Sequence, residues 1–153
     1  KEPGVYINPT SARLRGLDNP EKKMSKSAKS EYNYIALTDS PDIIEKKIKK
    51  AVTDSGTEIK FGEARPAISN LLSIYSLVTE KPIKEIEKEF IGKGYGDFKK
   101  SLTDHLINFI TPIQEKLTAI DDNELESILD IGAKRARGIA QAKVKQVREK
   151  IGL

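Results

Sequence analysis

The sequence contains no cysteine and only one histidine, His105, among its 153 residues. Disulfides and thiolate metal sites both require cysteine, so they are excluded. A lone histidine argues against a metal centre or triad built on histidine, and we expect no metal site on the protein. No stretch approaches the roughly 20 consecutive apolar residues of a membrane span, and the start lacks the pattern of a signal peptide. We therefore expect a cytoplasmic protein without membrane contact.

Charged side chains are abundant: they make up 33% of the chain, against 37% hydrophobic residues, a balance typical of a soluble helical protein. Lysine and arginine number 27 and acidic residues 23, which gives a net charge of +4 at pH 7. This surplus is compatible with a polyanionic partner. Many basic proteins merely carry solvated lysines, however, and charge alone favours that interpretation.

The first 40 residues differ from the rest of the chain. Residues 5–7 form a short β-prone run, residues 21–30 read as a long exposed basic loop, and residues 32–37 resume an apolar pattern that predicts another short strand. Two or three strands cannot bury both faces of a sheet by themselves. Either this segment packs on the helices or it is the edge of a larger sheet, and we favour the second arrangement.

From residue 40 onward the pattern is helical. Prolines at the starts of apolar periodic segments predict three helices, opened by Pro41, Pro66 and Pro82. The glycines of residues 92–96 predict a turn with unusual dihedrals, after which a fourth helix begins. Pro112 is expected to kink that helix or to begin a new turn. A last helix is predicted over about residues 123–151.

The segment Lys22-Lys23-Met24-Ser25-Lys26-Ser27 carries three ammonium groups and two hydroxyls, which can gather around a phosphate chain. Judged by charge alone, a solvated basic loop is the better interpretation. Residues 23–27, however, match letter for letter the KMSKS signature of the class I aminoacyl-tRNA synthetases. We refer to residues 23–27 as the KMSKS loop.

Three blocks of sequence after the KMSKS loop restrict the resemblance to one family among the class I synthetases. Residues 47–55, 66–72 and 92–99 resemble the tryptophanyl-tRNA synthetases, in order and at the spacing of that family, and the likeness covers essentially the whole chain. Two features depart from the family. After the KMSKS loop the chain continues Ala28-Lys29-Ser30-Glu31 without the usual proline, and no HIGH-type motif occurs, since the family carries that motif in an N-terminal half.

The resemblance implies a C-terminal half of a tryptophan–tRNA ligase, inactive alone, which in the whole enzyme uses ATP with Mg²⁺ to activate L-tryptophan and then esterifies tRNA(Trp). It implies catalytic roles for Lys23 and Lys26, with ATP contacts from Leu14, Lys23, Met24, Ser25, Lys26 and Ser27. Contacts to tRNA are expected from Lys46, Lys49 and Lys50. The amino-acid pocket and the contacts of a homodimer would lie in the N-terminal half.

The fold implied is mainly α-helical. Residues 1–40 would be the strand-and-loop tail of a Rossmann-like catalytic domain, residues 41–121 an anticodon-binding helical bundle, and residues 122–153 a helix returning to the catalytic domain. Three alternatives remain open: a tyrosyl-type synthetase, a non-catalytic tRNA-binding module, and a helical scaffold without a nucleic-acid role.

Overall fold

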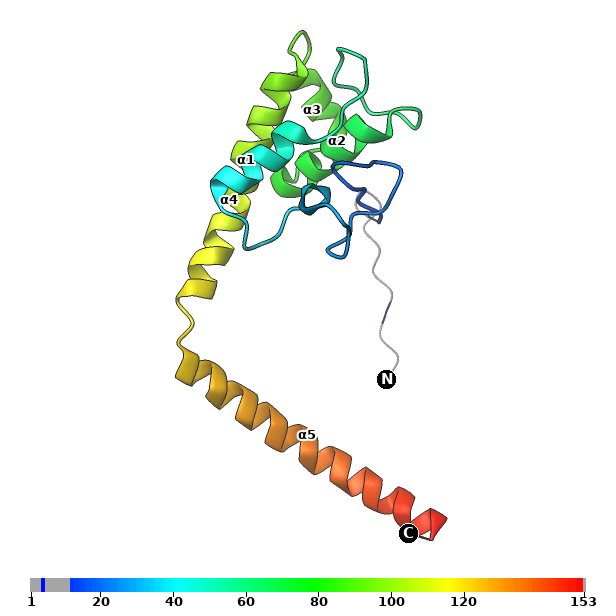
Figure 1. The fold of residues 1–153 in the computed structure, drawn as a ribbon, viewed down its shortest axis with the longest axis vertical. Helices are drawn as coiled ribbons and strands as arrows, with labels where there is room; N and C mark the ends of the chain where they lie inside the picture. The colour runs from blue at the N-terminus through cyan, green and yellow to red at the C-terminus, as the bar shows by residue number, and fades with distance from the viewer. Residues whose placement is uncertain (1–3, 5–11, 153) are drawn as a thin grey trace. The chain divides into compact units, whose positions relative to one another are not determined.

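The computed structural model describes residues 4 and 12–152, and these residues are mainly helical (Figure 1). The chain divides into two compact units, Lys1–Gln114 and Glu115–Leu153. One 3-10 helix, η1, precedes five α-helices: η1 Glu31–Asn33, α1 Pro41–Lys50, α2 Pro66–Thr79, α3 Ile83–Glu89, α4 Tyr95–Thr118 and α5 Asp122–Ile151. Within the described residues no strand is formed, and the expected strand at residues 5–7 lies outside them.

The predicted helix starts are confirmed, and side-chain caps account for those of α1 and α5. The Ser40 side chain accepts a hydrogen bond from the Ile43 main-chain nitrogen at the start of α1, where proline follows as the first helical residue. Asp121 caps α5 in the same way through the main-chain nitrogens of Asn123 and Glu124. Each cap satisfies main-chain donors that have no partner inside their own helix.

The predicted turn between α3 and α4 is also confirmed. Gly92 adopts a positive φ of 77°, a conformation that glycine reaches without steric penalty. Pro112 does not begin a new turn: it lies inside α4, which continues to Thr118.

The hydrophobic core is built around α2. Every residue from Ala67 to Tyr75 is buried, so this helix is enclosed on all sides rather than along the single stripe that its pattern predicts. The Tyr75 ring stacks on Phe98 at 5.6 Å between centroids and meets Phe90 edge-on at 5.8 Å. These aromatic contacts tie α2 to α4 and to the end of α3.

The strand expected over residues 32–37 is wrong. The chain forms η1 there, because the Ser30 hydroxyl accepts a hydrogen bond from the Tyr32 main-chain nitrogen and closes a tight turn. The described part of the head packs on the helices, and its membership of a larger sheet stays a prediction. Leu17 is buried in the common core, and Leu14, Met24 and Ile35 pack against that core.

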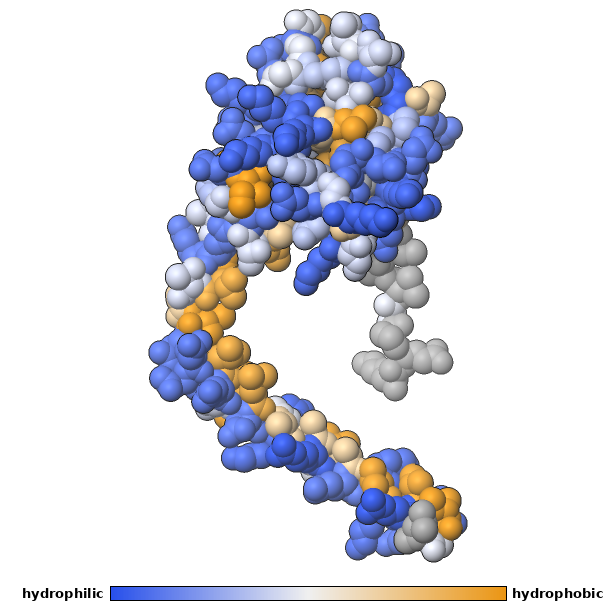
Figure 2. All heavy atoms as spheres, viewed as in Figure 1, coloured by the Kyte–Doolittle hydropathy of each residue, from blue (hydrophilic) through white to orange (hydrophobic). Residues whose placement is uncertain are grey.

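Helix α5 carries a row of exposed apolar side chains, seen as orange spheres along it in Figure 2. Its exposed large hydrophobic residues are Leu125, Ile128, Leu129, Ile131, Ile139, Val144, Val147 and Ile151. Exposed apolar side chains gathered along one helix are typical of a surface that contacts a partner. None of the helices in the described part of the chain is long and apolar enough to cross a membrane.

Candidate functional site

The base of the KMSKS loop is a short two-stranded contact. Arg15 and Lys23 form an antiparallel β-bridge, and the Met24 main-chain nitrogen donates to the Leu14 carbonyl at 3.0 Å. On the other side of the bridge, the Gly16 nitrogen donates to the Lys22 carbonyl at 2.9 Å. The chain therefore reverses direction before the loop, and both ends of residues 14–24 are held together.

A side chain of helix α2 anchors this contact to the core. The Asn70 side chain accepts from the Arg15 main-chain nitrogen at 2.8 Å and donates to the Arg15 carbonyl at 2.9 Å. Asn70 is itself buried. The base of the loop is thereby fixed to the core helix, although Arg15 lies 55 residues away in sequence.

The side chains of the KMSKS loop differ in burial. Met24 is half-buried and packs against the core, whereas Lys23, Ser25, Lys26 and Ser27 are exposed. A small turn shapes the loop, with the Ala28 nitrogen donating to the Ser25 carbonyl at 3.2 Å and the Ser27 nitrogen to the Ser25 hydroxyl at 3.2 Å. The methionine thus serves as an anchor, and the two ammonium groups are left available for an anionic ligand.

Asn33 packs next to this turn, and both polar atoms of its side-chain amide form hydrogen bonds. Its Oδ1 accepts from the Ser25 main-chain nitrogen at 2.9 Å, and its Nδ2 donates to Asp18 Oδ1 at 2.6 Å. Its carbonyl also accepts from the Leu17 nitrogen at 2.9 Å. Asn33 is only 5% exposed, and sequence reasoning did not single it out.

The lysines of α1 have different environments. Lys46, Lys49 and Lys50 are exposed, and the Lys50 ammonium lies 4.1 Å from the centre of the Tyr32 ring. Lys47 is buried instead, paired with Asp39 at 2.6 Å. It therefore stabilises the start of the helical region and is not available to a ligand.

A second polar cluster connects the loop after α1 with the start of α4. Arg65 Nε binds Asp54 Oδ2 at 2.6 Å, Arg65 Nη2 donates to the Tyr95 hydroxyl at 2.7 Å, and that hydroxyl donates to Asp54. Hydrogen bonding to Arg65 lowers the pKa of Asp54 to about 2, while burial and the contact with Asp54 raise the pKa of Tyr95 to about 12. Asp54 and Tyr95 lie in residues 47–55 and 92–99, two of the blocks that resemble the tryptophanyl-tRNA synthetases. The sequence therefore pointed to these two members of the cluster, whereas nothing in it indicated Arg65.

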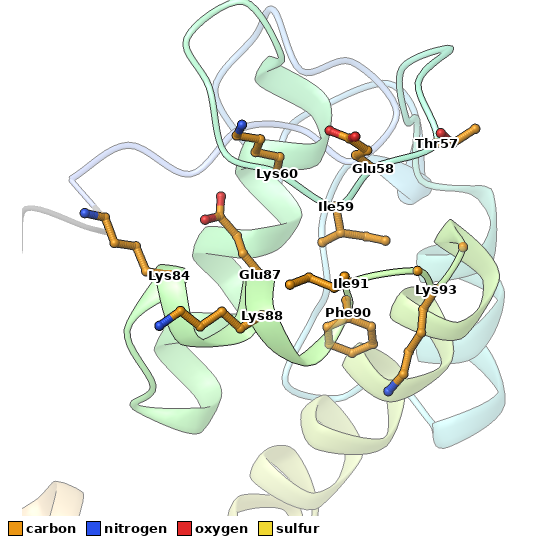
Figure 3. A pocket seen from close by; sticks show the side chains of 12 residues that line it. Thr57, Glu58, Ile59, Lys60, Lys84, Glu87, Lys88, Phe90, Ile91 and Lys93 are labelled. Carbon is orange, nitrogen blue, oxygen red and sulfur yellow. The ribbon is translucent and has the colours of Figure 1, made fainter.

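A pocket of about 740 Å³ opens between the loop after α1 and the turn after α3 (Figure 3). Ile59, Phe90 and Ile91 form its apolar wall. Four lysines stand around it, Lys60, Lys84, Lys88 and Lys93, together with Glu58 and Glu87. Glu87 is engaged, because its Oε1 accepts from the Phe61 main-chain nitrogen at 2.6 Å. The surroundings are thus basic on balance.

The matching family accounts for the loop and the helices together. Residues 1–111 match the family described as "tRNA synthetases class I (W and Y)". The chain belongs to this family of class I tRNA synthetases. The fold and the order of elements, from the KMSKS loop into a helical region, are those of a family member, and the resemblance inferred from the sequence is confirmed.

Two bacterial proteins illustrate the similarity to individual relatives. A protein named tryptophan–tRNA ligase from Helicobacter pylori (strain J99) is 46% identical over 153 residues, covering all of this chain and 47% of that protein. The protein of the same name from Bacillus subtilis (strain 168) is 44% identical, with 99% of this chain and 46% of that protein covered. The chain thus spans about half the length of the curated relatives it matches.

Solved structures give the same result. Tryptophanyl-tRNA synthetase from Mycoplasma pneumoniae superposes with a TM-score of 0.79 at 30% identity, covering 95% of this chain and 45% of that one. The enzyme from Campylobacter jejuni, solved with ADP and tryptophan, gives 0.74 at 33% identity over 97% of this chain and 46% of that one. The synthetase fold therefore extends through nearly the whole chain.

Proposed function

We propose that this chain supplies the C-terminal portion of a tryptophan–tRNA ligase, which activates L-tryptophan with ATP and transfers it to tRNA(Trp). The observation that carries the proposal is the KMSKS loop itself, held on a fixed base with Lys23 and Lys26 exposed, in a chain of the synthetase family. The curated relatives named above for tryptophan rather than tyrosine support the choice of amino acid.

The loop's part in the reaction is to bind the phosphates of ATP. Lys23 and Lys26 would stabilise the negative charge that moves onto the leaving pyrophosphate, and charge stabilisation that grows toward the transition state raises the rate. Ser25, Ser27 and the main chain near Leu14 and Met24 would complete the ATP contacts. Mg²⁺ carried by ATP would shield the same phosphates, and the exposed lysines with no acidic residue inside the loop fit this polyanion.

The helical part would meet tRNA. The exposed lysines of α1, Lys46, Lys49 and Lys50, provide cations for the phosphate backbone, and such contacts give affinity without reading sequence. A lysine-bordered pocket in the same unit adds to the basic surface that favours a nucleic-acid partner.

The remaining assignments concern the whole enzyme. Residues 1–40 would be the tail of a Rossmann-like domain, residues 41–121 the anticodon-binding bundle, and residues 122–153 the helix that returns to the catalytic domain. The exposed apolar row of α5 supports the last point, because it needs a partner surface. The parent enzyme would be a cytoplasmic homodimer assembled through its N-terminal half.

Complementation tests the proposal. The 153-residue chain is mixed with a separately produced N-terminal half of the B. subtilis relative, and amino-acid-dependent exchange of pyrophosphate into ATP is measured. We expect exchange with tryptophan from the mixture and none from this chain alone. Exchange with tyrosine instead would assign the other amino acid of the family. If the mixture associates and binds tRNA without any exchange, the chain is a non-catalytic tRNA-binding module.

A further inference from the structure

The Asn33 side chain hydrogen-bonds both to the KMSKS loop and to the segment that leads into it. It accepts from the Ser25 main-chain nitrogen at 2.9 Å on one side and donates to Asp18 at 2.6 Å on the other. Ser25 lies in the middle of the loop, between Met24 and Lys26. The contact therefore acts on the main chain directly before Lys26, whereas the main chain of Lys23 is held by its bridge to Arg15.

The side chain and the main chain of Asn33 are both held in place by their surroundings. A Cβ atom built on Gly16 would lie 2.1 Å from Asn33 Nδ2, so the absence of a side chain at residue 16 makes room for the amide. The main chain of Asn33 is held too, since its nitrogen donates to the Ser30 carbonyl at 3.2 Å and its carbonyl accepts from Leu17. A buried amide that is satisfied at both atoms has one stable orientation.

The loop has few other restraints of its own. Apart from the packing of Met24, the main chain of residues 25–28 is held by the local turn at Ser25 and by the hydrogen bond from Ser25 to Asn33. Of these, the bond to Asn33 reaches to another element, η1. Loss of this bond would leave a short exposed turn, whose free energy of opening is small.

We propose that Asn33 is a positioning residue of the KMSKS loop: through Asp18 and the Ser25 main chain, it holds the turn that carries Lys26, next to the bridge that holds Lys23, in a defined resting conformation. It touches no substrate itself. The structural part stands on the hydrogen bonds, whereas its consequence for ATP rests on the proposed function. A preorganised loop reaches the phosphates with less loss of conformational entropy, so the rate of activation depends on Asn33.

The structural part is tested in the 153-residue chain by amide hydrogen exchange at Ser25. We expect Asn33→Ala to speed exchange at Ser25 by about tenfold, the factor of one typical hydrogen bond, while exchange in α2 and α4 stays unchanged. Asn108→Ala, which alters an exposed asparagine of α4, is the matched control and should change nothing. Unchanged exchange at Ser25 in a folded Asn33→Ala protein would overturn the proposal.

A charge swap covers the case in which Asn33→Ala fails to fold. In Asn33→Asp two carboxylates face each other at neutral pH, so Ser25 should lose its protection. In the double variant Asn33→Asp/Asp18→Asn the donor and acceptor are exchanged, and residue 18 can donate to the carboxylate at 33, which still accepts from Ser25. We expect the double variant to regain wild-type exchange at Ser25. If it stays as unprotected as the single variant, the proposal is wrong.

Kinetics in the complemented enzyme test the consequence. Asn33→Ala should lower kcat for tryptophan-dependent pyrophosphate exchange by about tenfold and leave the KM for tryptophan unchanged, with recovery in the charge swap. An unchanged kcat despite faster exchange at Ser25 would refute the positioning role. The absence of exchange activity in the wild type, with the Ser25 result as expected, would refute the proposed function and leave the structural part intact.

Discussion

Asn70 binds both main-chain polar atoms of Arg15, accepting from its nitrogen at 2.8 Å and donating to its carbonyl at 2.9 Å. A neighbouring β-strand would normally supply these two bonds. Here a side chain of α2 replaces the strand, so a short extended segment is satisfied on a helical core. Arg15 in turn pairs with Lys23. The KMSKS loop is therefore connected to the helical core through Arg15.

Replacing Asn70 should therefore destabilise the chain. Asn70→Ala leaves the Arg15 nitrogen and carbonyl without their partner, and each unsatisfied half-buried group costs about 1–3 kcal/mol. We expect the free energy of unfolding in urea to fall by about 2–4 kcal/mol. This is less than the summed cost of the two unsatisfied groups, because water reaches part of the site. Asn108→Ala serves again as the control. A loss no larger than in that control would mean that the two bonds do not stabilise the fold.

Lys26 is expected to stabilise the transition state of tryptophan activation. In the complemented enzyme, Lys26→Ala should lower the rate of pyrophosphate exchange by on the order of 10²–10³-fold, the loss typical of one preorganised charge stabiliser. Tryptophan affinity should barely change, since the loop contacts phosphates rather than the amino acid. Lys29→Ala removes another exposed lysine three residues away and should have little effect. Equal rates for both variants would mean that the loop does not act in activation.

The lysines of α1 are expected to contact the tRNA backbone. The triple variant with Lys46, Lys49 and Lys50 changed to glutamine should bind tRNA more weakly and with a flatter salt dependence, because each lost phosphate contact removes roughly one released counterion. Binding isotherms at several salt concentrations measure the slope. The matched control changes Lys143, Lys145 and Lys150 of α5, which are equally exposed. The same slope in both variants would place tRNA elsewhere than α1.

Acid stability should depend on Asp54. Its pKa is about 2 in the fold, below the ordinary 3.8, mainly because of Arg65. The ionised form therefore stabilises the fold above pH 3.8, and this contribution is lost as the pH falls from 3.8 toward 2. Asp54→Asn should weaken the fold at pH 7 and flatten the pH dependence in that window, as followed by urea unfolding. Asp104→Asn, at an exposed position of α4, should keep the wild-type profile. A wild-type slope in Asp54→Asn would exclude Asp54 as its source.

The helices were predicted well because their signals are local. Serine, aspartate and proline at the starts act within one turn, so α1, α2 and α5 begin where their residues indicate. The region of residues 32–37 was predicted wrongly for the opposite reason. Its apolar alternation suits a strand, but a strand needs neighbours to pair with. In the described part of the chain no strand lies beside it, and the turn capped by Ser30 forms instead.

In the candidate site, too, local sequence patterns were predictive and long-range contacts were not. The letters of the KMSKS loop and the downstream blocks determined the family, because they specify chemistry and spacing along the chain. The sequence alone also determined that no disulfide can form and where most helices start. Only the tertiary structure decided that Lys47 is buried with Asp39 while its neighbours are exposed, that Arg65 joins Asp54 to Tyr95, and that Asn33 and Asn70 hold the loop. These contacts join residues up to 55 positions apart, and a hydrogen bond across such a distance depends on how the helices pack, which no local pattern encodes.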